Sequence, residues 1–379
     1  MVLNENQKMI RDMTRDFARS KLAPIAAEID ESGAFPEATV KEMGQLGLLG
    51  LTVPPEEGGT RVDTLSYALV VAELGKVCGS HGLTVAAHNS LGCWPVHAFG
   101  TPEQKERWLK PACQGEFLLS FGLTEAEAGS DAGGTRTTAV RDGDGWVLNG
   151  SKQWITNSHY AGALIITAVT DPDQPPGKGI SAFLVPTDTP GFTVEKKEDK
   201  LGMRASDTAP LVLEDVRVGP EALLGEEGAG FRYFLETLDG GRISIAALAL
   251  GIAEGAFAVS RDYAKERIQF GRPIAKQQAV AFMLADMSTQ IDAAKLLIHE
   301  ACRLEDAHEP FADMSAKAKL FASEMAMKVT YDAIQILGGY GFCREYPVER
   351  MYRDAKLCTI GEGTSEIQRM VIGRGVLAD

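Results

Sequence analysis

The sequence predicts an α+β fold in which a β-domain separates two helical domains, and three observations predict it. Helix signals dominate residues 1 to about 116, strand signals dominate from about 117 to 218, and helical periodicity returns from Gly228. The chain has 379 residues, which is long enough for two or three domains. We therefore expect a helical domain at residues 1–118, a β-domain at 119–225 and a second helical domain at 226–379.

Two helix starts support the first helical region. Asn4 and Gln7 have the N-x-x-Q spacing of a variant capping box. Residues 101–104, TPEQ, combine a threonine at the N-cap, a proline at the first helical position and a glutamine at the third. Residues 54–60, PPEEGGT, have the composition of a loop between such helices.

The middle region contains short apolar runs of strand length. Residues 163–170 and 180–185 are two such runs, and the Pro/Gly-rich segment 171–179 separates them. Another strand is expected after the turn at 142–145. Because no helical pattern lies between these strands, a parallel βαβ sheet is not expected. The pattern predicts an antiparallel barrel or sandwich.

Apolar residues in the last region recur at alternating spacings of four and three, which is typical of a long helix packed in a bundle. They are Val280, Leu284, Met287, Ile291, Ala294 and Ile298. A core-packing role is expected for all of them.

Composition limits the partners and the location of the protein. The net charge of −14 argues against nucleic acid or an anionic membrane as the main partner. The first residues, MVLNENQKMIRDMTRDFARSK, show neither an apolar signal core nor the features of a transit peptide. The longest apolar segment, residues 243–253, is too short to cross a bilayer. The six cysteines include no C-x-x-C pair, so reduced thiols and a bacterial-like cytoplasmic location are expected.

Several common catalytic motifs do not occur in the sequence. It contains no dinucleotide fingerprint G-x-G-x-x-G, no P-loop, no G-x-S-x-G and no H-E-x-x-H. The six histidines lack any recognised metal-ligand spacing, so a structural or surface role is expected for each and no metal site is expected. Rossmann dehydrogenases, zinc enzymes and serine hydrolases are therefore disfavoured.

Three polar or glycine-rich stretches remain as candidates for ligand binding. Residues 123–134, LTEAEAGSDAGG, either expose backbone N–H groups to a pyrophosphate or form a loop between domains. In residues 151–158, SKQWITNS, Trp154 either stacks on an isoalloxazine ring or is a core aromatic on a strand. In residues 266–278, ERIQFGRPIAKQQ, Arg267 either meets a phosphate or is solvated at a helix end.

These stretches occur together with three further blocks, and in this order the chain resembles the acyl-CoA dehydrogenases along essentially its whole length. The six blocks are LTEAEAGSDAG, KQWITN, KLGMRASDTAPLVLEDVRV, ERIQFGRPIAKQQAVAFMLADM, QILGGYGFCREYPVERMYRDAKL and IGEGTSEIQRMVIGR. The resemblance implies an N-terminal helical domain, a middle β-domain and a C-terminal four-helix bundle. It also implies non-covalently bound FAD, an acyl-CoA substrate and a homotetramer built as a dimer of dimers.

The resemblance assigns residues to FAD and to the substrate. Those expected to contact the flavin are Phe121, Leu123, Thr124, Gly129, Ser130, Trp154, Ile155 and Thr156. Those expected to reach the FAD of a neighbouring subunit are Arg267, Phe270, Gln278, Gln335 and Gly339. Thr364 and Glu366 are expected near the adenosine diphosphate part of FAD. Those expected to bind acyl-CoA are Ser130, Asp239, Arg242, Gly363 and Arg374. For Arg242, an alternative is a surface position near a helix start.

The resemblance also assigns the catalytic base to Glu362, in IGEGTSEIQR. It implies that Glu362 abstracts the α-proton of the acyl-CoA while flavin N5 accepts the β-hydride, which gives a trans-2-enoyl-CoA. A flavin ribityl hydroxyl and the N–H of Glu362 are expected to donate to the thioester carbonyl. A dry pocket raises the pKa of such a base toward the operating pH. The same stretch fits a helix start, with Ser365 and Gln368 as an S-x-x-Q capping box.

Two glycines refine this assignment. An isovaleryl-type branch of the family places its base one residue before the arginine of LDGGR and replaces the glutamate of EGT, whereas this chain has Gly241 and keeps Glu362. Straight-chain members often have a tyrosine before the base, whereas this chain has Gly361, which favours short or branched acyl groups.

Other activities of the same fold remain alternatives. Acyl-CoA oxidases pass electrons to oxygen, glutaryl-type dehydrogenases also decarboxylate, and flavin monooxygenases lack the glutamate base. A helical scaffold that has lost its flavin is the non-enzyme alternative. For a dehydrogenase, the resemblance implies an electron-transferring flavoprotein as acceptor and a place in fatty acid β-oxidation or branched-chain amino acid degradation.

Overall fold

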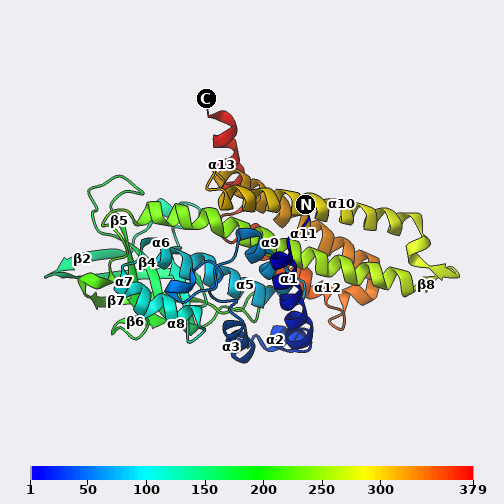
Figure 1. The fold of residues 1–379 in the computed structure, drawn as a ribbon, viewed down its shortest axis with the longest axis horizontal. Coiled ribbons are helices and arrows are strands. Elements are labelled where there is room, and N and C mark those ends of the chain that lie inside the picture. The colour runs from blue at the N-terminus through cyan, green and yellow to red at the C-terminus, as the bar shows by residue number, and fades with distance from the viewer. Residues whose placement is uncertain (1, 379) are drawn as a thin grey trace.

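A computed structural model describes residues 2–378 of the chain. Figure 1 shows the β-domain at one end of an elongated molecule and the long C-terminal helices running from it toward the other end. The N-terminal helices lie beside both. The expected order of helical, β and helical domains is confirmed.

The N-terminal domain consists of short helices. Its α-helices are α1 (Glu5–Phe17), α2 (Ala26–Ser32), α3 (Glu37–Gln45), α4 (Thr64–Gly75), α5 (Gly79–Ala87), α6 (Trp94–Phe99), α7 (Pro102–Gln104) and α8 (Lys110–Cys113). At α1 the Asn4 side chain accepts from the N–H of Gln7, and the Gln7 side chain accepts from the N–H of Asn4. Thr101 and Gln104 form the same reciprocal pair at α7. Both predicted capping boxes are therefore confirmed.

The middle domain is a seven-stranded sheet in which strand directions are mixed. Its strands are β1 (Leu118–Gly122), β2 (Thr138–Asp142), β3 (Gly145–Thr156), β4 (Ala161–Val169), β5 (Ile180–Pro186), β6 (Phe192–Val194) and β7 (Thr208–Val218). Their order is β1-β4-β2-β3-β7-β6, and β5 pairs with β4. β1 and β4 are parallel, with Phe121 opposite Ile165. The expectation of a wholly antiparallel sheet is therefore wrong for this pair. The β2–β3 hairpin between them returns the chain to the end of the sheet where β1 begins, and β4 therefore runs in the same direction.

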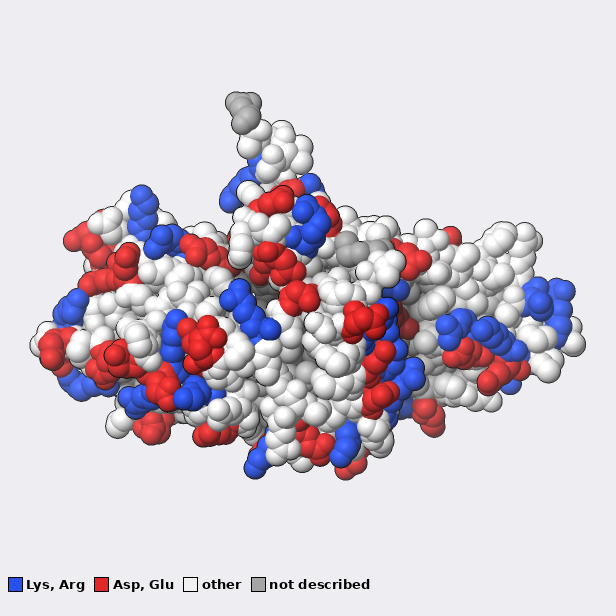
Figure 2. Space-filling view, viewed as in Figure 1, with Lys and Arg blue, Asp and Glu red and all other residues white. Residues whose placement is uncertain are grey.

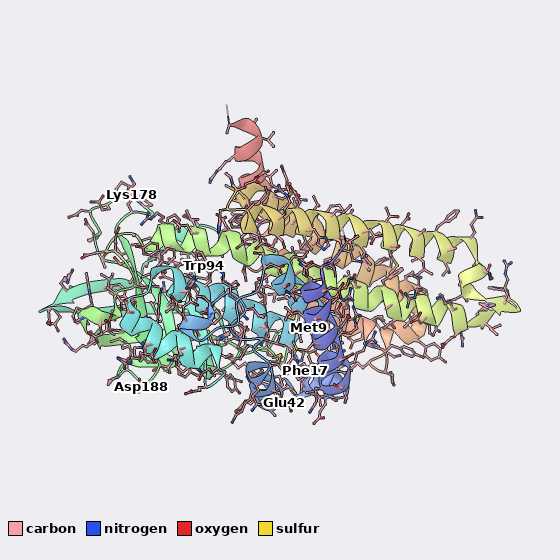
Figure 3. All side chains as sticks on the ribbon, viewed as in Figure 1. Met9, Phe17, Glu42, Trp94, Lys178 and Asp188 are labelled. Carbon is pink, nitrogen blue, oxygen red and sulfur yellow. The ribbon has the colours of Figure 1, made fainter. Side chains whose placement is uncertain are left out.

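The sheet has a core of its own beside the helical core. Trp146 and Phe183 are fully buried in it and meet edge to face, with 5.3 Å between ring centroids. The predicted loop at residues 171–179 connects β4 to β5, and Lys178 lies on its exposed part in Figure 3.

The C-terminal domain is a helical bundle. Its elements are α9 (Gly230–Glu266), the hairpin of β8 (Ile268–Gln269) and β9 (Arg272–Pro273), α10 (Gln278–Asp306), α11 (Ala312–Leu337), α12 (Val348–Ala355) and α13 (Ser365–Leu377). The shorter α12 packs against α9 and α11 and is the fourth member of the bundle. The predicted seam of α10 is buried at Met287, Ile291 and Ile298, and it is half-buried at Val280 and Leu284 near the outer end.

Among the described residues, α9 is the one helix that is long and apolar enough to cross a membrane. However, 78% of its apolar stretch is buried inside the protein. Packing against the N-terminal helices and the bundle therefore accounts for the apolar character of α9.

Candidate active site

Glu362 lies in the turn between the 3₁₀ segment Lys356–Thr359 and α13, which projects from the body of the molecule in Figure 1. Its backbone has φ +54°, and Gly363 follows with φ +92°. A left-handed backbone is uncommon for a residue other than glycine, and such positions often occur at functional sites. The turn directs the Glu362 side chain inward, toward α9.

One oxygen of the Glu362 carboxylate is isolated from solvent. Although the residue as a whole is half-buried, its Oε2 is fully buried and has no hydrogen-bond partner among the described residues. Burial raises the pKa of Glu362 to about 7, against the opposing effect of the cations Lys319 and Arg242. A carboxyl group with this pKa can exchange a proton near neutral pH, as a general base must.

Gly241 of α9 lies directly against this carboxylate. A β-carbon at position 241 would overlap Oε2 of Glu362, and it would lie 3.5 Å from the Leu91 side chain. Position 241, which the resemblance associates with the base of an isovaleryl-type branch, is therefore adjacent in space to Glu362. Only one of the two positions can carry a side chain without rearrangement.

Arg242 and Asp239, which lie three residues apart on α9, form an ion pair. Nη1 of Arg242 donates to Oδ1 of Asp239 at 2.5 Å. Arg242 is only 4% exposed, and its Nε is buried without a partner among the described residues. Because it lies twelve residues inside α9, the alternative of a surface residue near a helix start is wrong. Burial raises the pKa of Asp239, and Arg242 opposes this effect.

Lys319 of α11 is a residue of the site that the sequence patterns did not single out. Its side chain is fully buried, and Nζ donates to the carbonyl of Gly363 at 2.5 Å. Burial lowers its pKa to about 8. A signal was present in the sequence, because Lys319 falls on the apolar stripe of α11 with Ala322 and Ala326, where a lysine needs an explanation.

The helix start after Glu362 differs from the expectation. The N-cap of α13 is Thr364, whose side chain accepts from the N–H of Ile367, and Ser365 is already helical. The predicted box of Ser365 and Gln368 is therefore wrong. Gln368 instead donates from Nε2 to the carbonyls of Gly363 at 2.9 Å and Glu362 at 3.3 Å. These bonds satisfy its Nε2, whereas its Oε1 is buried without a partner among the described residues.

The loop at 123–134 is anchored by a buried ion pair that the sequence analysis also missed. Lys152 of β3 is fully buried and donates to Oε1 of Glu125 at 2.7 Å. Glu125 also accepts from the hydroxyls of Thr135 and Thr137. Burial alone would raise the pKa of Glu125, but Lys152 and these hydroxyls outweigh it and lower the pKa to about 2. The network fixes both ends of the loop to the sheet.

The predicted flavin contacts lie around this loop and β3. Trp154 is 59% exposed with φ +57°, at an irregularity in the pairing of β3 with β7. The alternative of a core aromatic is therefore wrong for Trp154. Ile155 is buried in the sheet core, so only its backbone can reach a ligand. The remaining contacts are exposed at Gly129 and Ser130, and half-buried at Phe121, Leu123, Thr124 and Thr156.

A second group consists of the residues expected to reach the FAD of a neighbouring subunit, and it is called the Arg267 group below. Its members are Arg267, Phe270, Gln278, Gln335 and Gly339. Arg267 and Gly339 line a cavity of about 470 Å³, together with Tyr263, Tyr340 and Cys343. Phe270, on the turn between β8 and β9, is 93% exposed, and Figure 1 places this hairpin at the far end of the bundle from α13. Gln278 and Gln335 are exposed as well. The predicted ligand contacts Glu366 and Arg374 are also exposed, but they lie on α13, which follows Glu362. A single chain does not bring the Arg267 group together with Glu362.

Comparisons with known proteins agree with this geometry. The family models for the N-terminal, middle and C-terminal domains of acyl-CoA dehydrogenase match residues 4–116, 120–216 and 228–377. The chain belongs to the acyl-CoA dehydrogenase family.

Individual acyl-CoA dehydrogenases match over nearly the whole chain. The "Probable acyl-CoA dehydrogenase YngJ" of Bacillus subtilis is 55% identical, and the match covers 99% of each chain. The "Acyl-CoA dehydrogenase, short-chain specific" of Clostridium acetobutylicum is 49% identical over 98% of this chain and 97% of that protein. The solved butyryl-CoA dehydrogenase of Megasphaera elsdenii has a TM-score of 0.97 and 45% identity, covering 100% of this chain and 99% of the other.

As an acyl-CoA dehydrogenase, the chain is an FAD-dependent oxidoreductase that acts on acyl-CoA thioesters. The residues present fit this cofactor. The exposed indole of Trp154 offers a flat surface beside the anchored loop 123–134, where Gly129 leaves open space for a ligand. Arg242 has a buried Nε–H that is without a partner among the described residues.

Proposed function

We propose that this acyl-CoA dehydrogenase converts a short or branched acyl-CoA to the trans-2-enoyl-CoA, with Glu362 as the base that takes the α-proton. One observation carries the proposal: Oε2 of Glu362 is buried, has no partner among the described residues and lies against Gly241. A carboxylate held in this way keeps a lone pair available for a proton. The raised pKa of Glu362, about 7, supports proton transfer near neutral pH.

The other residues have supporting roles. The N–H of Glu362 donates to the thioester carbonyl and stabilises the charge that develops on its oxygen. Arg242 and Asp239 hold the pantetheine arm, with Ser130, Gly363 and Arg374 as further substrate contacts. Bound FAD supplies the acceptor for the β-hydrogen, which leaves as hydride. It is held by the loop 123–134 and by Trp154.

The substrate preference rests on Gly361. The three atoms nearest to a β-carbon at this position belong to Leu357, the first at 3.6 Å, which is ordinary contact, and the φ of Gly361 is not left-handed. Neither the backbone nor packing therefore demands a glycine, and its effect is to leave space beside the base. Relatives named short-chain specific and butyryl-CoA dehydrogenase support a small acyl group.

The test uses the purified yellow protein and anaerobic bleaching of its flavin by acyl-CoA. We expect Glu362→Gln to keep FAD and to lose bleaching, and full activity in this variant would refute the assignment. A panel from C4 to C16, with branched members, tests the substrate. Equal rates across the panel would refute a short or branched preference.

The same protein separates the alternatives. Peroxide formed with acyl-CoA in air would indicate an oxidase, and released CO2 would indicate a glutaryl-type enzyme. A colourless protein that cannot take up FAD would indicate a scaffold. For the dehydrogenase we expect electrons to pass to an electron-transferring flavoprotein. A chain from the structure described as an electron transferring flavoprotein of Acidaminococcus fermentans supports this partner, with a TM-score of 0.98 and 48% identity over 100% of both chains.

A homotetramer built as a dimer of dimers is part of the proposal. Phe270 is 93% exposed, and α10 exposes Phe282 and Leu296. Figure 2 shows few charged side chains over the part of the visible face where Figure 1 places α10. The Arg267 group would then complete the FAD site of a neighbouring subunit. Mixed dimers of Arg267→Ala and Glu362→Gln should regain part of the activity that each lacks alone. Absence of any recovery, with exchange of subunits verified, would refute the shared site.

We also propose the domain boundaries 1–118, 119–225 and 226–379 and a cytoplasmic location. The burial of the apolar α9 supports the location. Limited proteolysis and cell fractionation test these two points.

A further inference from the structure

Lys319 is a buried cation with no role in the function proposed above. Its side chain is 0% exposed, and among the described residues its ammonium donates to a backbone carbonyl, Gly363 O, and forms no ion pair. A buried ammonium without a carboxylate partner is costly to stability. The burial of a lysine at this position of α11 therefore needs a physical explanation.

The carbonyl of Gly363 connects Lys319 to the catalytic turn. It accepts from Lys319 Nζ at 2.5 Å and from Gln368 Nε2 at 2.9 Å. Glu362 and Gly363 are the two residues of the turn with left-handed backbones. The two donors from α11 and α13 therefore hold the peptide that follows Gly363, and with it the end of this left-handed turn.

We propose that Lys319 is a positioning residue for the base: its ammonium holds the Gly363 carbonyl and favours the ionised form of the Glu362 carboxylate without hydrogen bonding to it. This inference rests on the proposed role of Glu362. A direct ion pair would occupy a lone pair of the carboxylate that must accept the proton. Anchoring on a carbonyl keeps the cation close and leaves Oε2 free. A nearby cation lowers the pKa of a carboxyl group and so opposes the effect of burial.

Other titratable groups interact electrostatically with Glu362 or Lys319. They are Arg242 of α9, Tyr67 of α4, Cys358 of the 3₁₀ segment and the exposed Glu366 of α13, and Glu305 of α10 interacts in turn with Tyr67. Arg242 also favours ionised Glu362, but it is paired with Asp239. Burial raises the pKa of both Tyr67 and Cys358, so these groups are neutral at pH 7. Lys319 differs from all of them because it binds the backbone of the turn.

The experiment compares variants that separate charge from hydrogen bonding. Lys319→Gln keeps an N–H donor for Gly363 and removes the charge, whereas Lys319→Met removes both. Lys317→Met is the matched control, because Lys317 lies on the same helix but is 38% exposed and paired with Asp313. For each variant, FAD content, affinity for a non-reacting acyl-CoA analogue and the pH dependence of anaerobic flavin reduction are measured.

We expect Lys319→Gln to bind FAD and the analogue as the wild type does. The acid limb of its pH profile should move up by about one unit, so that reduction slows about tenfold on that limb while the high-pH plateau is kept. Lys319→Met should show the same shift with a lower plateau, because the turn is also loosened. Lys317→Met should match the wild type.

An unchanged acid limb in Lys319→Gln would overturn the proposal. Loss of FAD from both Lys319 variants would overturn it as well, because it would assign Lys319 a structural role. Glu362→Gln is measured in parallel. If that variant still reduces its flavin, the proposed role of Glu362 fails. If it is inactive while Lys319→Gln keeps the wild-type profile, only the inference about Lys319 fails.

Discussion

Oε2 of Glu362 and the α-carbon of Gly241 adjoin so closely that a β-carbon at position 241 would overlap the carboxylate oxygen. One residue belongs to the turn before α13 and the other to the interior of α9. The glycine is therefore required by the position of the carboxylate, and the identity of one residue constrains the other.

Gly241→Ala should displace the carboxylate and lower the rate of flavin reduction by about a hundredfold, while FAD stays bound, because small misplacements of a reacting group are costly. Gly240→Ala is the control. Its β-carbon would meet only Glu305 Oε1, at 3.5 Å, and we expect a rate near that of the wild type. A wild-type rate in Gly241→Ala, measured by stopped-flow bleaching, would show that the contact is unimportant.

Glu362→Gln should stabilise the protein at alkaline pH. Burial raises the pKa of Glu362 to about 7, so the folded state binds a proton more tightly than the unfolded state. The free energy of unfolding of the wild type therefore falls as the pH rises from the pKa of Glu362 in the unfolded state to above about 7. The loss is roughly 3 kcal/mol, at about 1.4 kcal/mol per pKa unit. The gain in Tm of the variant should be present at pH 8 and absent at pH 4. An equal gain at both values would point to packing rather than charge.

Glu125→Gln should destabilise the β-domain, because it leaves the buried ammonium of Lys152 without its partner. Breaking one half of a buried ion pair typically costs about 3–5 kcal/mol. We also expect weaker FAD binding, since the pair anchors the loop 123–134. Glu127→Gln is the control, because Glu127 is 64% exposed. Chemical denaturation and FAD titration check both effects, and similar results for the two variants would argue against the anchor.

Gly361→Tyr should narrow the acyl pocket beside the base. We expect a larger fall in rate for acyl groups branched near the thioester than for butyryl-CoA, with FAD content unchanged. Gly373→Ala, on α13 where an added β-carbon meets nothing, provides a comparison that should leave the panel unaltered. A uniform fall across the acyl-CoA panel would mean that Gly361 does not select the substrate.

Thr364→Ala should cost about 1 kcal/mol of stability, because Thr364 is the N-cap of α13. Ser365→Ala should cost less, since the hydroxyl of Ser365 has no partner among the described residues. Thermal unfolding of the two variants measures these losses of stability. A larger loss in Ser365→Ala than in Thr364→Ala would instead support the capping box of Ser365 and Gln368 that the sequence predicts.

Local signals were the most reliable part of the sequence. The capping boxes at Asn4 and Thr101, the strands flanking the loop 171–179 and the seam of α10 depend on neighbouring residues, and the structure contains all of them. The parallel pairing of β1 with β4 could not be predicted, because register and direction depend on where the chain returns. The cap of α13 was misplaced by one residue because two adjacent hydroxyls satisfy the same pattern.

The candidate site, like the fold, could be predicted from the sequence only in part. Motif resemblance supplied Glu362 and Arg242 and linked Gly241 to the same site, but it gave no indication of the direct contact of Gly241 with the carboxylate or of Lys319 reaching the turn from α11. Such relationships join residues far apart in sequence, and only the packing of helices brings them together.

The continuity of α9 has a consequence for how the substrate is admitted. This helix runs without interruption for 37 residues, about 55 Å, and it contacts β5, α4, α5 and α11 along its length. The three domains thereby pack against one rigid helix that spans from the sheet to the bundle. We expect admission of acyl-CoA to depend on small movements of short loops rather than on closure of whole domains.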